Sequence, residues 1–160
     1  MKFAELKTQL LSVGATINSI TEDTTNWGGC CVVAAVVGKR LRELGVPVRA
    51  VVATYQGLSL LDREPTDRGD PDAWARVGIY FNHVGLEFKA GNRWHYFDSE
   101  GVKPRQRENN KLPAGDWPVI PGHLTVDEVA ELASNPHRWN PVFPRHTIPA
   151  IEEAVYRMLQ

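Results

Sequence analysis

The sequence lacks the features that would commit it to a membrane or to nucleic acid. None of its 160 residues belongs to a segment approaching the roughly 18 apolar residues of a membrane helix. Lys and Arg number 18 and Asp and Glu 19, so a net charge of −1 gives no basic field for a phosphate backbone. Charges interrupt residues 1–7, where a secretory signal needs an unbroken apolar stretch. We expect a cytoplasmic protein with no nucleic-acid or membrane partner.

Cysteine is scarce, and the two that occur, Cys30 and Cys31, are neighbours. Side chains at consecutive helical positions diverge by about 100°, so no disulfide is expected between them. The sequence has no Cys-x-x-Cys and no His-x-x-x-His. The pair Gly28-Gly29 lacks the lysine and the further glycines of a phosphate-binding loop. We expect no metal and no cofactor.

The overall composition is that of an ordinary globular domain. Hydrophobic residues make up 42% of the chain and charged residues 23%. A chain of 160 residues can bury one sizeable core but is short for two. Residues 1–160 should therefore form a single domain.

Hydrophobic periodicity predicts four helices. The first is amphipathic, spans residues 2–13 and should end at Gly14. The second should run from Cys30 to Leu44 and lie buried in the centre of the fold, because apolar residues cover almost its whole circumference. Two shorter helices are expected at residues 125–133 and 149–159.

Runs rich in β-branched residues, or with alternating apolar and polar residues, predict three strands, at residues 46–55, 77–88 and 93–98. The last two should form a hairpin through a short glycine-containing turn. We expect an irregular crossing at residues 100–122 and an extended segment at residues 144–148. An antiparallel sheet packed against a central helix is an α+β fold.

Cys30 lies where a polar segment gives way to the apolar start of the second helix. The first N–H groups of a helix lack intrahelical partners and the positive end of its dipole lies there, so a thiolate is favoured over a thiol. His83 and Asp98 lie on consecutive predicted strands, whose side chains on one face are roughly 5 Å apart. Cys30, His83 and Asp98 are therefore candidates for a nucleophile, its base and the residue that orients the base.

Each of these residues also has an ordinary structural interpretation. A cysteine beside valines is more often a packing residue, and Cys31 suits that role better than Cys30. A single strand histidine is usually structural, and Asp98 could simply begin a turn. His95 is at an odd separation from Asp98 on the same strand, so it should project from the opposite face.

The segment after Cys30 resembles the nucleophile helix of the transglutaminase-like superfamily and the turn into the strand that follows it. The matching landmarks are Cys30, Ala34, Gly45, Pro47 and Arg49. With Cys31 as the nucleophile, each later landmark would be one residue out of place. The segment from His83 to Asp98 is similar to the histidine strand, hairpin and aspartate strand of that family. The resemblance covers residues 26–101 and implies a papain-like fold with a Cys-His-Asp catalytic triad.

Two features depart from the family pattern or are not fixed by it. The family commonly has Trp two residues after the histidine, where this chain has Gly85, and the smaller residue should open room beside the imidazole. The oxyanion donor could be the side chain of Asn26 or Trp27, just ahead of the nucleophile. Gln9 and Asn18 are weaker candidates for this role, because no spacing ties them to the site.

The function that the resemblance implies is that of a thiol protease or amidase, a hydrolase that acts on the amide bonds of a protein or peptide through an acyl-enzyme. Two alternatives stay open. The acyl group could pass to an amine, as in a transglutaminase, or the chain could be a catalytically inactive papain-like module that binds or inhibits a partner. Its small size favours hydrolysis, and the polar stretch at residues 57–76 is interpreted as a lid over the cleft.

Overall fold

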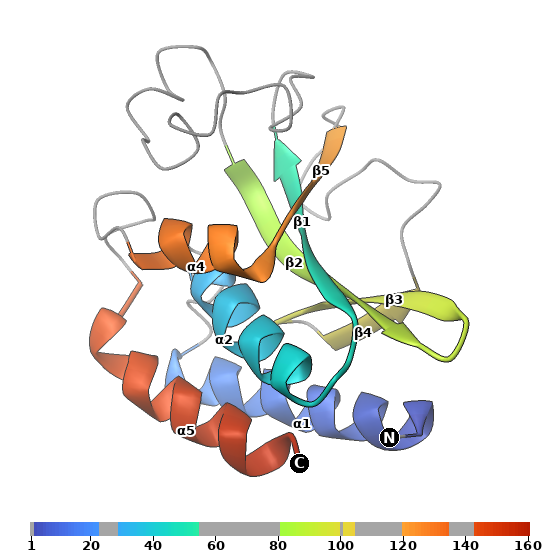
Figure 1. Ribbon diagram of the computed structural model, residues 1–160. Helices are drawn as coiled ribbons and strands as arrows, with labels where there is room; N and C mark the ends of the chain where they lie inside the picture. Colours follow the sequence, from blue (N-terminus) through green and yellow to red (C-terminus); the bar gives the residue numbers. More distant parts are fainter. Residues whose placement is uncertain (1, 23–28, 55–80, 100, 105–119, 135–142) are drawn as a thin grey trace.

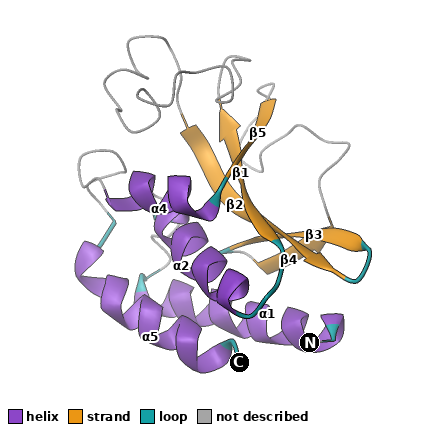
Figure 2. Cartoon of the chain, viewed as in Figure 1, coloured by secondary structure: helices purple, strands orange, loops and turns teal. Residues whose placement is uncertain are grey.

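The computed structural model describes residues 2–22, 29–54, 81–99, 101–104, 120–134 and 143–160. These residues form four α-helices, a short 3-10 helix and a five-stranded sheet, and the helices and the sheet occupy separate layers (Figures 1 and 2). The α+β class expected from the sequence is confirmed. The elements are α1 (Phe3–Ile20), α2 (Cys30–Glu43), β1 (Val48–Thr54), β2 (Phe81–Ala90), β3 (Arg93–Asp98), β4 (Gly101–Pro104), β5 (Ile120–Leu124), α4 (Val126–Ser134), η4 (Arg145–Thr147) and α5 (Ile148–Met158).

The sheet has the strand order β4-β3-β2-β1-β5, and all neighbouring strands are antiparallel. The predicted hairpin is confirmed as β2 and β3, which turn tightly at Gly91, where φ is +59° and glycine is favoured. Val84, Leu86 and Phe88 alternate along β2 and are almost completely buried in the core. The sheet therefore has one apolar face, and Figure 2 shows that the helices cover that side.

Helix α2 is the central buried helix that the sequence predicted, and it lies between the sheet and helices α4 and α5 (Figure 1). Its close approach to both layers depends on Gly38. A Cβ at that position would lie 3.0 Å from Cγ2 of Val126 and 3.2 Å from Cδ2 of Leu86. At the far end, Arg42 forms a bidentate pair with Asp127 of α4, with distances of 2.7 and 3.0 Å.

Helix α1 is longer than predicted, because Gly14 does not end it. The helix continues to Ile20, and its buried stripe extends to Ile17. A Cβ on Gly14 would lie 3.3 Å from the carbonyl oxygen of Ser99. This glycine therefore permits a close contact between α1 and the turn after β3, which a sequence pattern cannot distinguish from a helix end.

Strand β4 and the start of β5 fall in the region, residues 100–122, that was predicted to be an irregular crossing. Strand β4 pairs with β3 and strand β5 pairs with β1, so they are the two outer strands of the described sheet. Both contain proline and glycine, residues that central strands avoid but edge strands tolerate. The prediction was wrong because this composition is as typical of edge strands as of loops.

The C-terminal third contains two confirmed predictions and one wrong one, and the helix expected at residues 149–159 is α5. The helix expected at residues 125–133 is α4, and it begins with a capping box. Thr125 N–H donates to the Glu128 carboxylate at 2.8 Å, and Glu128 N–H donates to the Thr125 hydroxyl at 3.2 Å. The segment predicted to be extended at residues 144–148 is instead η4 and the start of α5, and Thr147 Oγ1 donates to the Pro144 carbonyl at 2.6 Å. In the part of the chain described here, no helix has the length and apolar character needed to span a membrane.

Candidate active site

Helix α2 begins at Cys30, as the sequence predicts. The first hydrogen bond of the helix runs from Val33 N–H to the Gly29 carbonyl at 3.0 Å, so the N–H groups before Val33 have no intrahelical acceptor. The positive end of the helix dipole therefore lies at Cys30. The residue is largely buried, with 7% of its surface exposed.

Cys31 differs from Cys30 in its burial. It is fully buried, and this burial raises the pKa of its thiol far above the usual range; a negative charge on Cys30 would raise it further. The N–H groups of Val32 and of Cys31 itself stabilise the Cys31 thiolate, but burial outweighs them. Cys31 is therefore held as a neutral packing residue. No disulfide joins the two cysteines.

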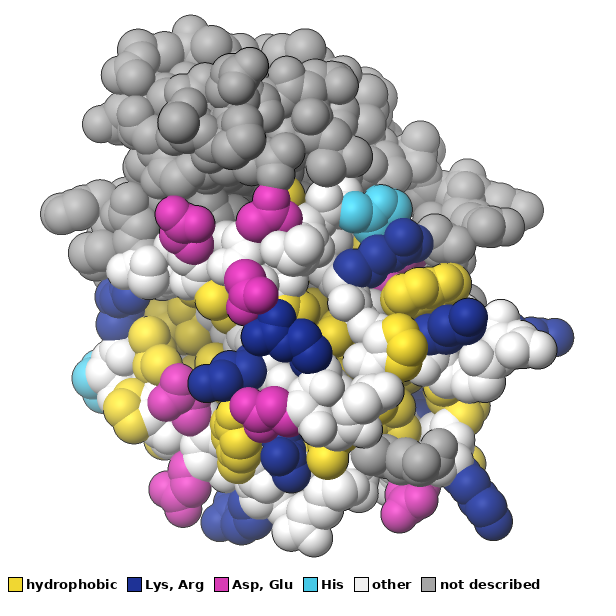
Figure 3. All heavy atoms as spheres, in the orientation of Figure 1, with side chains coloured by type: hydrophobic (Ala, Val, Ile, Leu, Met, Phe, Trp, Pro, Cys, Tyr) yellow, Lys and Arg dark blue, Asp and Glu magenta, His cyan; other side chains and the backbone are white. Residues whose placement is uncertain are grey.

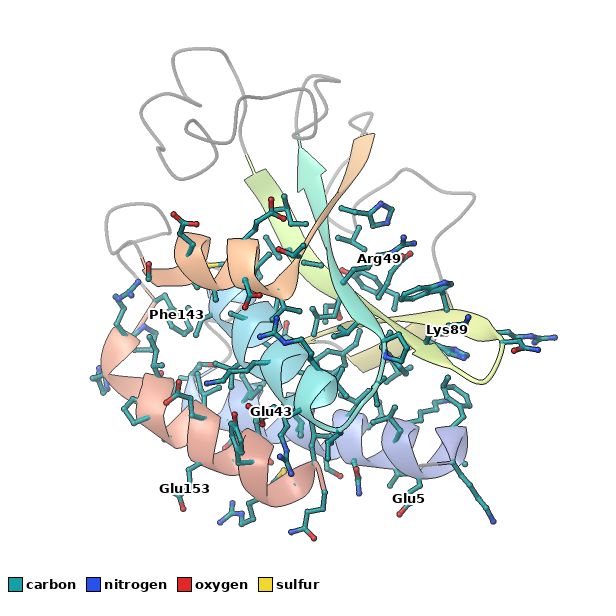
Figure 4. The ribbon with its side chains drawn as sticks, viewed as in Figure 1. Glu5, Glu43, Arg49, Lys89, Phe143 and Glu153 are labelled. Atoms are coloured by element: carbon teal, nitrogen blue, oxygen red, sulfur yellow. The ribbon has the colours of Figure 1, made fainter. Side chains whose placement is uncertain are left out.

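Phe143 covers the residue that precedes the nucleophile candidate. Its ring occupies the space that a Cβ on Gly29 would need, so the ring and the backbone of Gly29 are in close contact. Figure 4 labels Phe143 close to the start of α2. No motif links residue 143 to residue 29, and sequence reasoning missed this contact beside Cys30.

Asp98 and His83 lie on neighbouring strands of the sheet. Asp98 ends β3 and is 5% exposed. The β2–β3 register pairs Leu86 with Phe97, and extending it by one residue sets Asp98 opposite Gly85. His83 lies two residues before Gly85 and therefore at a position on the same face of β2. Diagonal neighbours of this kind are about 7–8 Å apart. The side chain of His83 lies outside what the structure describes.

Cys30 and Asp98 line the same small cavity, although they belong to different layers of the fold. Its volume is about 10 Å³, which is room for about one water molecule. The cavity lies where the start of α2 meets β2 and the end of β3. The residues that line it are Cys30, Val33, Ala34, Val84, Gly85, Leu86, Phe97, Asp98 and Ser99.

The space beside Gly85 is filled rather than open. The Tyr96 side chain crosses from β3, and its hydroxyl and ring lie where a Gly85 side chain would be, with Cε2 only 2.6 Å from the Cβ position. Tyr96 is 9% exposed. The room that the glycine was expected to open is therefore taken up by Tyr96. The chain has a glycine at one position and a large aromatic residue on the next strand that covers it.

Helix α1 holds the turn that follows Asp98. The Asn18 side chain donates through Nδ2 to the Ser99 carbonyl at 2.9 Å, so Asn18 supports this turn and that donor does not face an oxyanion. Gln9, the other weak candidate, has a buried Oε1 with no hydrogen-bond partner among the described residues.

Several of the residues named from the sequence are not in the described ranges. Asn26 and Trp27, the leading oxyanion candidates, lie outside them, as does the stretch at residues 57–76 that was interpreted as a lid. The described part of the site therefore consists of Cys30, Asp98 and the walls around them.

A charged cluster lies on the face of the sheet away from the helices. Glu87 is buried and its Oε2 lies 2.6 Å from Nη2 of Arg49 and 3.3 Å from Nε2 of His123. The Arg49 guanidinium also stacks over the Trp94 ring, 4.5 Å from its centroid. Figure 4 shows Arg49 on this side of β1. The alternation along β2 predicts the face that Glu87 occupies, but nothing in the sequence links His123 to it.

His95 projects to the other face of the sheet, as expected from its separation from Asp98. Its ring stacks on Phe3 of α1 with centroids 4.0 Å apart and lies 5.6 Å from the Phe88 ring. His95 is therefore a packing residue between α1 and the sheet rather than a second base for the site. Within the described ranges, no group of three or more His, Cys, Asp and Glu side chains is placed to hold a metal ion. No family model, no curated protein and no solved structure matches this chain.

Proposed function

We propose that the protein is a cysteine peptidase or amidase with a papain-like, transglutaminase-like fold. One observation supports this most: Cys30, at the first position of α2, and Asp98, at the end of β3, line one cavity. By position, His83 and Asp98 share one sheet face, the face of Glu87 rather than the one that α2 covers, so the triad requires the His83 imidazole to reach Cys30 past the end of β3, where Asp98 and Cys30 line one cavity. A thiol at a helix N-terminus, a histidine and a buried carboxylate are the three parts of a nucleophilic triad.

In the proposed reaction the Cys30 sulfur attacks the carbonyl carbon of an amide, and His83 takes the thiol proton. His83 then gives this proton to the amine as the carbon–nitrogen bond breaks, leaving a thioester on Cys30. A water molecule gives a proton to His83 and attacks the thioester; the carbon–sulfur bond breaks, the acid leaves, and His83 returns the proton to the Cys30 sulfur. Asp98 orients the imidazole and stabilises its charged form. The Cys30 N–H, at the positive end of α2, donates to the developing oxyanion.

Desolvation supports the division of roles between the two cysteines. Burial holds Cys31 neutral, and a neutral thiol is a poor nucleophile. Cys30 has the helix N-terminus beside it and Asp98 on the same cavity. The proposed mechanism therefore requires that only Cys30 reacts as a nucleophile.

One observation favours the alternative of a papain-like module that binds or inhibits a partner without chemistry. The cavity next to Cys30 holds about one water molecule, with a volume of about 10 Å³. A substrate carbonyl does not fit beside the sulfur within these walls. If the site never opens, Cys30 is a core residue and the protein acts only by binding.

A labelling experiment separates the two proposals. The full chain is treated with iodoacetamide, and alkylation of Cys30 and Cys31 is followed by peptide mass spectrometry. An enzyme gives faster labelling at Cys30 that is lost in His83→Ala, with Cys31→Ser as the matched control that keeps the fast reaction. Equal, slow labelling of both cysteines would overturn the catalytic proposal and favour the binding module.

Turnover identifies the acyl acceptor. Wild type and Cys30→Ala are compared on a library of fluorogenic peptide amides, with and without a primary amine such as cadaverine. Release of the acid identifies a hydrolase, whereas an amine-linked product identifies the transglutaminase-type alternative. Activity that survives in Cys30→Ala contradicts both.

A further inference from the structure

A second, larger cavity lies on the side of α2 that faces away from the sheet. Helices α4 and α5 both pack on α2, and the space between them encloses about 300 Å³. This volume is at the lower end of the range for small-molecule sites. Figure 3 shows the hollow as apolar side chains framed by basic and acidic ones. Of the described site residues, Cys30 and Asp98 do not line it, so it is separate from the cavity that those two residues share.

The floor of this cavity, which we call the helix groove, is apolar. Helix α2 supplies the outward-facing Val32, Ala35 and Val36, and the side walls come from α4 and α5. The wall residues are Val126, Ala130 and Ile148. Burying an apolar chain in the groove would be favourable, because its surface is removed from water and no buried polar group is displaced.

The charges at the Arg42 end of the groove neutralise each other. The Arg42 guanidinium makes two hydrogen bonds to the Asp127 carboxylate, at 2.7 and 3.0 Å. The Tyr156 hydroxyl donates to Glu43 at 2.8 Å. Lys39 and Glu152 line this half as well and carry opposite charges. This end therefore has no net preference for an anion.

The Arg145 end differs, because its positive charge has no described carboxylate as a partner. Arg145 Nη2 donates to the carbonyl oxygens of Ala133 at 3.1 Å and Ser134 at 3.5 Å, in the last turn of α4, which satisfies donors and offsets only part of the charge. Glu152 is two turns further along, roughly 10 Å on a helical rise. Arg145 is also near enough to α2 to favour the thiolate of Cys31. The positive end of the α2 dipole and Arg145 thus act on the same end of the groove.

We propose that the helix groove binds a small amphiphilic acid, a molecule with a short aliphatic body and one carboxylate. The carboxylate pairs with Arg145, and the aliphatic body lies over Val36 toward α4. The requirement for an acid follows from a guanidinium that has no carboxylate partner among the described residues, and the aliphatic body follows from the apolar floor. Because the charges of the opposite half neutralise one another, a second carboxylate on the ligand would gain nothing there.

The probe is sodium octanoate, with octanamide as its uncharged analogue. Backbone amide spectra of the full ¹⁵N-labelled chain are titrated with each. Octanoate should give saturable shifts at Val32, Val36, Ala130 and Ile148, with a Kd on the order of 1 mM for so small a ligand. Octanamide should bind about tenfold more weakly, because it cannot form the charge-assisted hydrogen bonds. Shifts that do not saturate, or equal affinities for the two probes, overturn the proposal.

Two variants and a control localise the site. Ala130 is exposed on α4, so Ala130→Trp fills the groove without removing a buried contact and should abolish binding of both probes. Arg145→Gln should lower octanoate affinity to that of octanamide. Arg157→Gln, which removes an exposed arginine of α5 outside the groove, should change nothing. Unaltered octanoate binding in Ala130→Trp refutes the location, and the comparison of the two probes on the wild type decides the case even if Arg145→Gln unfolds.

Discussion

Arg49 and Glu87 face each other across β1 and β2, and both Nε and Nη2 of the guanidinium contact the same carboxylate oxygen, at 2.8 and 2.6 Å. The Glu87 side chain is only 7% exposed, so its charge is stabilised by these contacts and by His123 rather than by water. The Trp94 ring lies against the other side of the guanidinium and fixes its plane. This relationship ties the three central strands together on the face away from the helices.

Removing the arginine should destabilise the fold. Arg49→Met leaves the Glu87 carboxylate buried without its main partner. Breaking a fully buried pair costs roughly 3–5 kcal/mol, and because the Arg49 side chain is 32% exposed we expect a loss of about 2 kcal/mol. Urea unfolding followed by circular dichroism measures it. The double variant Arg49→Met/Glu87→Leu should recover most of the loss, and a double variant less stable than Arg49→Met would contradict this account.

His95 should make stability depend on pH. Burial, followed by the charges of Arg93 and Lys7, lowers the pKa of His95 below its usual value of about 6.5. The unfolded chain therefore binds a proton at a pH where the folded chain does not, so stability falls as the pH drops below about 6.5 toward the lower folded-state pKa. Well above pH 6.5, His95 is neutral in both the folded and the unfolded chain, so its contribution to stability does not change with pH.

The measurement compares melting temperatures of wild type and His95→Phe at pH 7.5 and 5.5. Phe keeps the stacking on Phe3 and cannot take up a proton, so the variant should lose less stability than wild type on acidification. Identical pH dependence in the two proteins would show that His95 does not contribute.

Gly29 should not tolerate even one added carbon. Its backbone has φ −89° and ψ −9°, which alanine adopts without strain, so any penalty for Gly29→Ala comes from the collision with the Phe143 ring. Overpacking of this kind costs about 1–3 kcal/mol. Thermal unfolding of Gly29→Ala, Phe143→Ala and the double variant measures the coupling.

The double variant decides the cause of that penalty. If Phe143 is the obstacle, Gly29→Ala should cost much less in the Phe143→Ala background than in wild type. Strict additivity of the two losses would mean that the ring does not restrict residue 29. Gly45→Ala is a useful comparison, because nothing lies within 4 Å of its Cβ position and its φ of +74° alone penalises alanine.

Asn18 should affect the proposed site by positioning Asp98 rather than by contacting the substrate. Asn18→Leu removes the hydrogen bond to the Ser99 carbonyl, one residue after Asp98. We expect a loss of about 1 kcal/mol of stability and, in an active enzyme, a fall of about tenfold in kcat with KM unchanged, because the carboxylate shifts while substrate binding does not. Asn18→Asp, which cannot donate, should behave similarly, and Asn18→Gln should restore part of the activity. A change in KM alone would contradict a positioning role.

The parts of the fold that the sequence predicts correctly are those with a strong local pattern. Alternation of apolar and polar residues along β2 identifies the buried face. Apolar residues around almost the whole circumference of α2 identify a central helix that begins at Cys30. Strand β3 was predicted with the correct bounds because it is bracketed by turn residues.

The errors have a different physical origin, because they depend on contacts between distant segments. Gly14 is needed where α1 meets Ser99, not at a helix end, and Gly85 lies under Tyr96 from the next strand. The wall that Phe143 makes against Gly29 joins residues more than a hundred positions apart. No local pattern distinguishes a glycine that ends a helix from one that admits a neighbour.

The outer strands of the sheet also affect how this chain behaves beside other copies of itself. Strand β4 ends at Pro104, and Pro121 lies within β5, so each outer strand has one backbone position with no N–H to donate. Both strands are short, at four and five residues. Short, proline-containing edges are poor templates for strand addition by a second chain. The described sheet is thus protected at both edges against edge-to-edge aggregation, even though its central strands are rich in valine and phenylalanine.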